Sequence, residues 1–196
     1  MNWNDWHSAK DAQAPNEHLV RFASKWKDRS MVLDIGSGNG CNASFLVTQG
    51  HLVHCIDASI QAVEKASMRL TALGKWAKPY WAAMLQKIDD QSCPETGSYD
   101  VAIDICTLQH VDDLDMALRK TYGQLAKNGT FYTIFASDET TYRSDVEFAH
   151  TTFIRRDELV RRLKDAKFGI VSVERVERTL MNGQYRVVHW IVEAVK

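Results

Sequence analysis

The stretch VLDIGSGNG, residues 32–40, joins a short apolar run to three glycines at alternate positions. The apolar run is typical of the end of a buried strand, and the residues after position 40 favour a helix. A glycine-rich turn between a strand and a helix offers free backbone N–H groups and the positive end of the helix dipole. The stretch therefore predicts a site where a nucleotide-like ligand lies against the backbone.

Apolar and amphipathic segments alternate on both sides of this stretch. A helix is predicted to begin at Pro15 or Asn16. Strands are predicted at residues 31–35, 52–57, 79–84, 99–105 and 130–136. Helices are predicted at residues 41–49, 60–73, about 113–127 and 156–166. This alternation indicates a parallel sheet that is covered by helices on both faces.

The C-terminal segment departs from the alternation. The run from Phe168 to Leu180 and the run from Tyr185 to Val195 are separated by MNGQ. Asn-Gly is the favoured two-residue turn of a β-hairpin, so the two runs are predicted to be antiparallel neighbours. The expected fold is an α/β, three-layer, Rossmann-like fold whose seven-stranded mixed sheet has one antiparallel strand, near or at an edge.

Composition limits the domain organisation and the classes of partner. A chain of 196 residues with 45% hydrophobic residues predicts one domain over residues 1–196, with an N-terminal arm and helix over residues 1–28. The 24 basic and 25 acidic side chains give a net charge of −1, which does not favour nucleic acid as a partner. The polar N-terminus and the lack of a long apolar stretch predict a cytoplasmic protein with no membrane partner.

The four cysteines predict neither a disulfide framework nor a metal site. They are far apart and form no C-x-x-C pair, and they stand at positions Cys41, Cys55, Cys93 and Cys106. We expect reduced, mostly buried thiols and no metal.

The spacing of the glycines narrows the class of ligand. A dinucleotide fingerprint would need glycine at Cys41, and the Gly-Lys-Ser/Thr of a P-loop is absent. Instead, Asp34 stands two residues before a G-x-G-x-G series formed by Gly36, Gly38 and Gly40. This pattern resembles the first motif of class I S-adenosylmethionine-dependent methyltransferases. The alternatives are a glycine-rich turn that binds nothing and the pyrophosphate site of a variant dinucleotide enzyme.

Three later segments carry the same resemblance. YDVAIDICTLQHVDD, residues 99–113, is similar to the family's fourth strand and the loop beside the methionine end of the cofactor. LAKNGTFYTIF, residues 125–135, is similar to its next helix end, turn and strand, and the Asn-Gly hairpin resembles its reversed seventh strand. The resemblance covers residues 15–196. It is nearest to the small-molecule branch that includes thiopurine-type and tellurite-type methyltransferases.

The resemblance implies an enzyme with S-adenosylmethionine as cofactor and S-adenosylhomocysteine as product. A small-molecule acceptor would receive the methyl group by direct in-line displacement. Two other functions remain open on the sequence, namely a nicotinamide-dependent oxidoreductase and a non-catalytic S-adenosylmethionine-binding regulator. The acceptor is not determined, and the chain could be a monomer or a homodimer.

The implied cofactor site runs along the carboxyl ends of the first two strands. Ser37 joins Asp34 and the glycines in the first turn. Asp57, at the end of the second strand, is placed to accept hydrogen bonds from a ribose diol, and Ala58 follows it. A role at the start of the following helix is the structural alternative for Asp57, with Ser59 as the better-placed cap.

The adenine and methionine ends of the cofactor are assigned to the third and fourth strands. The family often has an acid and a small residue after its third strand, whereas this chain has Met84 and Leu85, with Asp89 further on. We expect Met84 to pack on the adenine and the Leu85 backbone or Asp89 to bond it. The methionine end is assigned to Asp104, Ile105 and Cys106; a carboxylate held by loop amides is the alternative for Asp104, and Cys106 is expected to be a packing residue.

The acceptor end is assigned to the loop after the fourth strand. His110 is the candidate base and Gln109 could orient a polar acceptor. The alternative is a helix entry in which His110 bonds Asp112 or Asp113. If the acceptor is a thiol, a selenol or a neutral amine, His110 would only position it.

Two variable segments are expected to supply the remaining substrate contacts. The insertion at residues 137–154 could fold over the site as a lid and contributes Tyr142 and His150. The N-terminal arm contributes Trp3, Trp6 and His7, although the two tryptophans could instead fasten the arm to the body of the protein.

Overall fold

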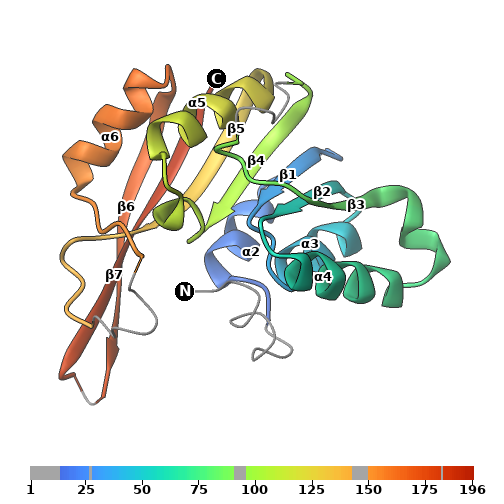
Figure 1. Cartoon of the computed structure of the whole chain (residues 1–196), viewed down its shortest axis with the longest axis horizontal. Helices are drawn as coiled ribbons and strands as arrows, with labels where there is room; N and C mark the ends of the chain where they lie inside the picture. Colours follow the sequence, from blue (N-terminus) through green and yellow to red (C-terminus); the bar gives the residue numbers. More distant parts are fainter. Residues whose placement is uncertain (1–13, 27, 91–95, 143–149, 182) are drawn as a thin grey trace.

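The computed structural model describes residues 14–26, 28–90, 96–142, 150–181 and 183–196, and Figure 1 shows their arrangement. In chain order the elements are α2 (Glu17–Ala23), β1 (Met31–Ile35), α3 (Cys41–Thr48), β2 (Leu52–Asp57), α4 (Ile60–Ala72), the 3-10 helix η1 (Lys75–Tyr80), β3 (Trp81–Leu85), β4 (Tyr99–Ile105), the 3-10 helix η2 (Leu108–His110), α5 (Leu114–Gln124), β5 (Leu125–Ala136), α6 (Arg156–Asp165), β6 (Gly169–Leu180) and β7 (Tyr185–Val195). None of the helices in these ranges is long and apolar enough to cross a membrane.

The strands form one seven-stranded sheet in the order β3-β2-β1-β4-β5-β7-β6. The pairs among β1 to β5 are parallel, whereas β7 runs antiparallel to both β5 and β6. The expected mixed sheet with one reversed strand from a C-terminal hairpin is therefore confirmed. The reversed strand lies one position in from the edge.

Helices cover both faces of the sheet, as Figure 1 shows, with α5 and α6 on one face and α2, α3 and α4 on the other. Strand β1 supplies both hydrophobic cores because its side chains alternate between the two faces. Leu33 and Ile35 pack in the core under α5 and α6, and Val32 packs in the core under α2 to α4. A strand that is buried on both faces explains why apolar residues stand at successive positions on both sides of Asp34 before the glycines.

Helix α2 is held at a fixed place beside the first turn. The Asn16 side chain caps the helix by accepting from the backbone N–H groups of His18 and Leu19, at 3.0 and 3.2 Å. The Asn16 N–H in turn donates to the Asn42 Oδ1 atom of α3 at 2.9 Å. The predicted helix start is thus confirmed, and α2 is tied to the helix that follows the glycine-rich turn.

The boundary between α5 and β5 and the start of β3 differ from those predicted from the sequence. Helix α5 ends at Gln124, not near residue 127, and β5 begins at Leu125. Asn128, which has a positive φ of 65°, lies within β5 and therefore does not end the helix. The fully buried Leu125 side chain and the pairing of Tyr99 with Leu125 hold this stretch in the sheet. Strand β3 also begins slightly late, at Trp81, because η1 precedes it.

The β6–β7 hairpin extends beyond its neighbour in the sheet. Strand β5 pairs with β7 only as far as Ala136 opposite His189, whereas β6 and β7 remain paired out to Leu180 opposite Tyr185. Ala136 is the carboxyl end of β5. The tip of the hairpin therefore projects past the carboxyl ends of the parallel strands, as the long red arrows in Figure 1 show.

Candidate functional site

A cavity of about 1170 Å³ lies at the carboxyl ends of β1, β2 and β4. Many of the residues singled out in the sequence line it, namely Gly36, Ser37, Gly38, Asp57, Ala58, Ile105, Cys106, Gln109, His110, Tyr142 and His150. Five others are not among its lining residues, namely Asp34, Gly40, Met84, Leu85 and Asp104. Trp3, Trp6 and His7 lie outside the described residues.

The Asp57 carboxylate joins the glycine-rich turn to the start of α4. Its Oδ2 atom accepts from the Gly38 N–H at 2.9 Å and its Oδ1 atom accepts from the Ser59 N–H at 2.8 Å. Ser59 caps α4, as expected, through a hydrogen bond from the Ala62 N–H. A carboxylate has about four acceptor positions, so two protein donors leave capacity for a ligand in the cavity. Asp57 therefore combines the structural role with a position that suits ligand binding.

Two of the three glycines are required by close contacts inside the protein. Gly36 has φ +67°, and a Cβ atom there would lie 2.1 Å from Thr107 Oγ1. Gly40 has φ +74°, and a Cβ atom there would lie 2.9 Å from the Ala66 backbone. A ligand was expected to explain the missing side chains, whereas protein atoms make the close approach at Gly36 and Gly40.

Asp34 lies inside the protein behind the turn. Its side chain is buried, and its Oδ2 atom has no hydrogen-bond partner among the described residues. Burial, followed by the nearby carboxylates of Asp57 and Asp104, raises the pKa of Asp34 to about 7. Because a cation close by would favour the charged form, this group favours a positively charged ligand in the neighbouring cavity.

Asp104 is held by the loop that follows β4. Its Oδ1 atom accepts from the backbone N–H groups of Thr107 and Leu108, at 2.8 and 3.0 Å. Its Oδ2 atom accepts from the Thr133 hydroxyl at 2.6 Å. Burial raises the pKa of this carboxyl group to about 6. This geometry matches the alternative in which backbone amides of the loop hold the Asp104 carboxylate. Asp104 therefore fixes the shape of the loop and is not one of the residues that line the cavity.

Cys106 lines the cavity next to this buried carboxyl group. It adopts a positive φ of 62°, which aims the chain from β4 into η2. Burial, and then the charge of Asp104, raise the pKa of its thiol to about 12. The thiol is therefore uncharged at neutral pH and unreactive as a nucleophile, in keeping with the packing role expected from the sequence.

The segment after β3 lines the cavity with residues that come later in the sequence than Met84 and Leu85, which were expected there. Met84 and Leu85 are 43% and 57% exposed and do not line the cavity. The first residue of this segment that lines the cavity is Gln86, and Ile88 and Asp89 also line it. Ile88 is 3% exposed and is the apolar residue of this segment that lines the cavity, a position predicted for Met84. Its position as the apolar residue in the polar run QKIDD was the signal that could have identified it.

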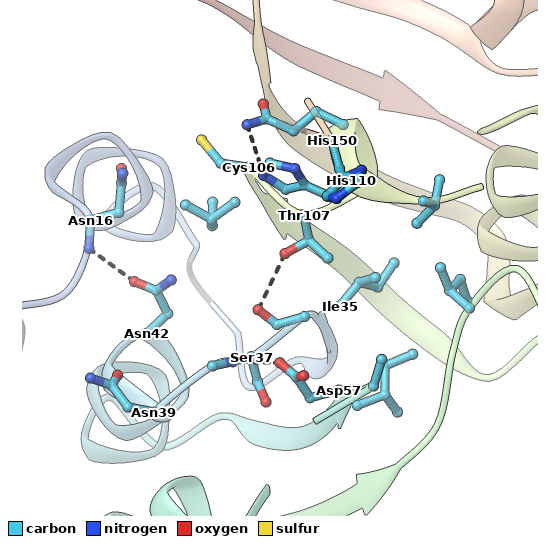
Figure 2. A pocket seen from close by; sticks show the side chains of 18 of the residues that line it. Asn16, Ile35, Ser37, Asn39, Asn42, Asp57, Cys106, Thr107, His110 and His150 are labelled. Atoms are coloured by element: carbon cyan, nitrogen blue, oxygen red, sulfur yellow. Dashed lines mark hydrogen bonds between the residues drawn. The ribbon is translucent and has the colours of Figure 1, made fainter. Parts of the chain in front are cut away.

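Gln109 and His110 form a hydrogen-bonded pair that lines the cavity. Figure 2 shows His110 across the cavity from Asp57. The Gln109 Oε1 atom accepts from the Ala136 N–H at 2.8 Å, so the amide nitrogen faces the His110 ring. That nitrogen lies 3.2 Å from His110 Nε2. Since an amide NH₂ group can only donate, Nε2 carries the lone pair and Nδ1 carries the proton.

The surroundings of His110 keep its ring uncharged. The Nδ1 atom lies 3.3 Å from the Thr151 hydroxyl oxygen, and burial lowers the pKa of the ring. Asp113, which the sequence offered as a partner, accepts instead from the Met116 N–H as the cap of α5. The loop therefore presents a neutral imidazole with a defined tautomer to the cavity.

The hairpin supplies a wall of the cavity that the sequence analysis missed. Its lining residues are Arg178, Leu180, Val187 and His189. They stand at alternate positions of two paired strands, so they share one face of the hairpin. The alternation was visible in the sequence, but no local feature showed that this face lines the same cavity as the glycine-rich turn. Among the described residues, no cluster of His, Cys, Asp and Glu could hold a metal ion.

Solved structures of methyltransferases resemble this fold. A Methanosarcina mazei S-adenosylmethionine-dependent methyltransferase is 17% identical, with a TM-score of 0.74 over 94% of this chain and 99% of that one. The magnesium protoporphyrin IX methyltransferase of Synechocystis, with bound S-adenosylmethionine, is 19% identical, with a TM-score of 0.68 over 91% and 76%. The 1,6-didemethyltoxoflavin-N1-methyltransferase of Burkholderia thailandensis is 18% identical, with a TM-score of 0.69 over 91% and 76%.

Sequence comparison identifies the family. A search of curated protein sequences found no match. The methyltransferase domain family matches residues 33–131, which begin in β1, contain the glycine-rich turn and end in β5. This match spans half of the chain and includes most of the cavity described above. The chain therefore belongs to the methyltransferase domain family, and its fold is that of S-adenosylmethionine-dependent methyltransferases.

Proposed function

We propose that this enzyme transfers the methyl group of S-adenosylmethionine to a small-molecule acceptor by direct in-line displacement. One observation carries the proposal: the cavity places the Asp57-bound glycine turn opposite a neutral His110 whose Nε2 lone pair is defined. The side with the glycine turn and Asp57 suits a nucleoside. The side with His110 suits an acceptor that must give up a proton. The family match sets aside the nicotinamide-dependent oxidoreductase.

The residues of the first two turns fit the cofactor. We assign the ribose to Asp57, whose carboxylate is fixed by two backbone donors and retains acceptor capacity. Ser37 lines the cavity together with Gly36 and Gly38, so the backbone of this turn is also assigned to the cofactor. The adenine is assigned to the segment from Gln86 to Asp89, with Ile88 as its apolar contact.

The chemistry needs no nucleophile from the protein. S-adenosylmethionine supplies a methyl group on a positively charged sulfur, which is already activated for displacement. The contribution of this chain is to hold the acceptor in line and to exclude water. The buried carboxyl of Asp34 favours the positive charge from behind the turn. Its distance from bulk solvent strengthens that effect.

His110 is proposed as the group that removes the acceptor proton. An acceptor O–H or N–H group that competes with the Gln109 amide for Nε2 can donate its proton there. Gln109 is the orienting group, since its own carbonyl oxygen is fixed by the Ala136 N–H. For a thiol, a selenol or a neutral amine, His110 would position the acceptor without removing a proton.

Two observations support a small molecule as the acceptor. The cavity of about 1170 Å³ must hold cofactor and acceptor together, which leaves room for a molecule of modest size. The structural neighbours act on compounds such as 1,6-didemethyltoxoflavin and magnesium protoporphyrin IX. The near-neutral balance of charges on the chain does not favour a nucleic acid.

The proposal is tested by incubating the protein with S-adenosylmethionine labelled in the methyl group and with a small-molecule extract of cells. Mass spectrometry should reveal labelled products that are absent with the Asp57→Ala variant. Binding of S-adenosylhomocysteine is measured in parallel by calorimetry. If S-adenosylhomocysteine binds but no extract yields a labelled product, the regulator replaces the enzyme as the better reading of the site.

A further inference from the structure

The wall formed by the β6–β7 hairpin differs in charge from the rest of the cavity. The lining carboxylates Asp57, Asp89 and Asp112 come from β2, from the segment after β3 and from the end of the η2 loop. The lining residues from Tyr142 onward include no carboxylate in the described part of the chain. Arg178 is the one Lys or Arg side chain of this wall among the described residues.

The Arg178 side chain has no hydrogen bond or ion pair with any described residue. Arg175, three residues earlier on the same strand, bonds Glu139 and Glu177, each at 2.8 Å. The odd spacing places these two guanidinium groups on opposite faces of β6. The one that faces away from the cavity is neutralised by acids, and the one that faces the cavity is not.

Arg178 has both apolar and polar neighbours on this face of the hairpin. Leu180 and Val187 line the cavity beside it, and the Tyr142 ring packs against Tyr185 with centroids 5.6 Å apart. His189 also lines the wall, and burial, followed by the charges of Arg178 and His18, lowers its pKa. His189 is therefore a neutral hydrogen-bonding group, and the fixed positive charge belongs to Arg178.

We propose that this wall binds the methyl acceptor through an anionic oxygen group, a carboxylate or a phosphate, which Arg178 recognises at the mouth of the cavity. Leu180, Val187 and Tyr142 then cover the apolar body of the acceptor. Guanidinium groups pair with carboxylates and phosphates through two parallel N–H···O bonds, which fixes orientation as well as position. The inference rests on the proposed function and narrows its substrate class to amphiphilic acids.

The placement of the charge explains how an acceptor would enter the site in one orientation. The hairpin tip projects past the carboxyl ends of the parallel strands, whereas His110 lies in the loop directly after β4. An anionic group held by Arg178 at the rim leaves the opposite end of the molecule directed inwards. Arg178 is thus a specificity residue, and it takes no part in the chemical step.

The test uses simple probes with protein that is saturated with S-adenosylhomocysteine. Benzoate and phenyl phosphate represent the two anionic groups, and benzamide is their neutral counterpart. Binding of each probe is followed by NMR chemical shifts in wild type, in Arg178→Gln and in the control Arg175→Gln. We expect wild type and the control to bind at least one anion about tenfold more tightly than benzamide, and Arg178→Gln to lose that preference.

Three results would overturn the inference. They are equal binding of anions and benzamide by wild type, an anion preference that survives in Arg178→Gln, and no binding of any probe. A loss of S-adenosylhomocysteine affinity in Arg178→Gln would assign the guanidinium to the carboxylate of the cofactor instead, and would also reject the proposal. If wild type does not bind S-adenosylhomocysteine, the proposed function fails, while the same titration of the ligand-free protein still decides the anion site.

Discussion

The backbone N–H of Gly38 donates to Oδ2 of Asp57 at 2.9 Å, and this bond joins the ends of two neighbouring strands. The other oxygen of the same carboxylate accepts from the Ser59 N–H and so fixes the start of α4. One side chain therefore sets the shape of the glycine turn, the direction of the next helix and a part of the cavity lining. Cofactor affinity and the local order of the turn should depend on it together.

Asp57→Ala should weaken binding of S-adenosylhomocysteine roughly 10- to 100-fold, because both the ligand contact and the support of the turn are lost. The affinity is measured by calorimetry, and stability by thermal unfolding. Asp113→Ala is the matched control, because Asp113 caps α5 by a 2.8 Å bond to the Met116 N–H and does not line the cavity. The control should lose similar stability but keep its affinity. Equal affinity losses in both variants would contradict a direct role for Asp57.

Gly36→Ala should destabilise the protein by about 2 kcal/mol or more. The new Cβ atom would meet Thr107 at 2.1 Å and would also have to tolerate a φ of +67°. Gly50→Ala separates the two causes, because Gly50 has φ +93° and nothing within 4 Å of the added atom. Chemical denaturation should show a smaller loss for Gly50→Ala, and Thr107→Gly should restore part of the loss in Gly36→Ala. No restoration would mean that the contact with Thr107 is unimportant.

His110→Ala should lower kcat by roughly 100-fold or more for an acceptor with an O–H or N–H group, with unchanged affinity for S-adenosylhomocysteine. Because burial lowers the pKa of His110, the acid limb of the wild-type rate profile should lie below the ordinary histidine value of 6.5. Gln109→Glu should move that limb upwards, since a carboxylate at this position favours the charged ring. His54→Gln is the control, as His54 bonds Tyr99 away from the cavity. An unchanged pH–rate profile in Gln109→Glu would show that residue 109 does not influence the pKa of His110.

The strands at the centre of the sheet could be predicted from the sequence because local pattern and tertiary environment agree there. The structure places β1 at Met31–Ile35, β2 at Leu52–Asp57 and β4 at Tyr99–Ile105, as predicted. The end of α5 could not be predicted in this way. The segment from Leu125 to Asn128 has residues that can continue a helix, but pairing with Tyr99 holds it in the sheet.

Those parts of the candidate site that depend on one turn were accessible from the sequence, and those that depend on long-range contacts were not. The glycines and Asp57 were placed together by the strand–turn–helix pattern. Thr107 reaches Gly36 across 71 positions, and Arg178 reaches the cavity only because a hairpin overhangs it. The sequence around Thr107 and around Arg178 has no pattern that predicts either contact. The neutral tautomer of His110 likewise depends on a distant residue. The Ala136 N–H, at the end of β5, fixes the Gln109 amide, and that amide sets the tautomer of His110.

Burial and the carboxylates of Asp57 and Asp104 raise the pKa of Asp34 from 3.8 to about 7. In the ligand-free protein, the contribution of this group to stability is present below pH 3.8 and is lost as the pH rises towards 7. A cation in the adjoining cavity has the opposite effect, because it favours the charged carboxylate and lowers its pKa.

Affinity for S-adenosylmethionine should therefore rise roughly tenfold between pH 5.5 and pH 8, which corresponds to about one unit of pKa change, and binding should release protons below pH 7. Calorimetry in buffers of different ionisation enthalpy measures both effects. S-adenosylhomocysteine should show a weaker rise, because its sulfur is uncharged. Asp34→Asn should abolish the rise for the charged ligand, since its amide cannot ionise. A pH dependence that is the same for both ligands, or that persists in Asp34→Asn, would show that the buried carboxyl group does not respond to the sulfonium charge.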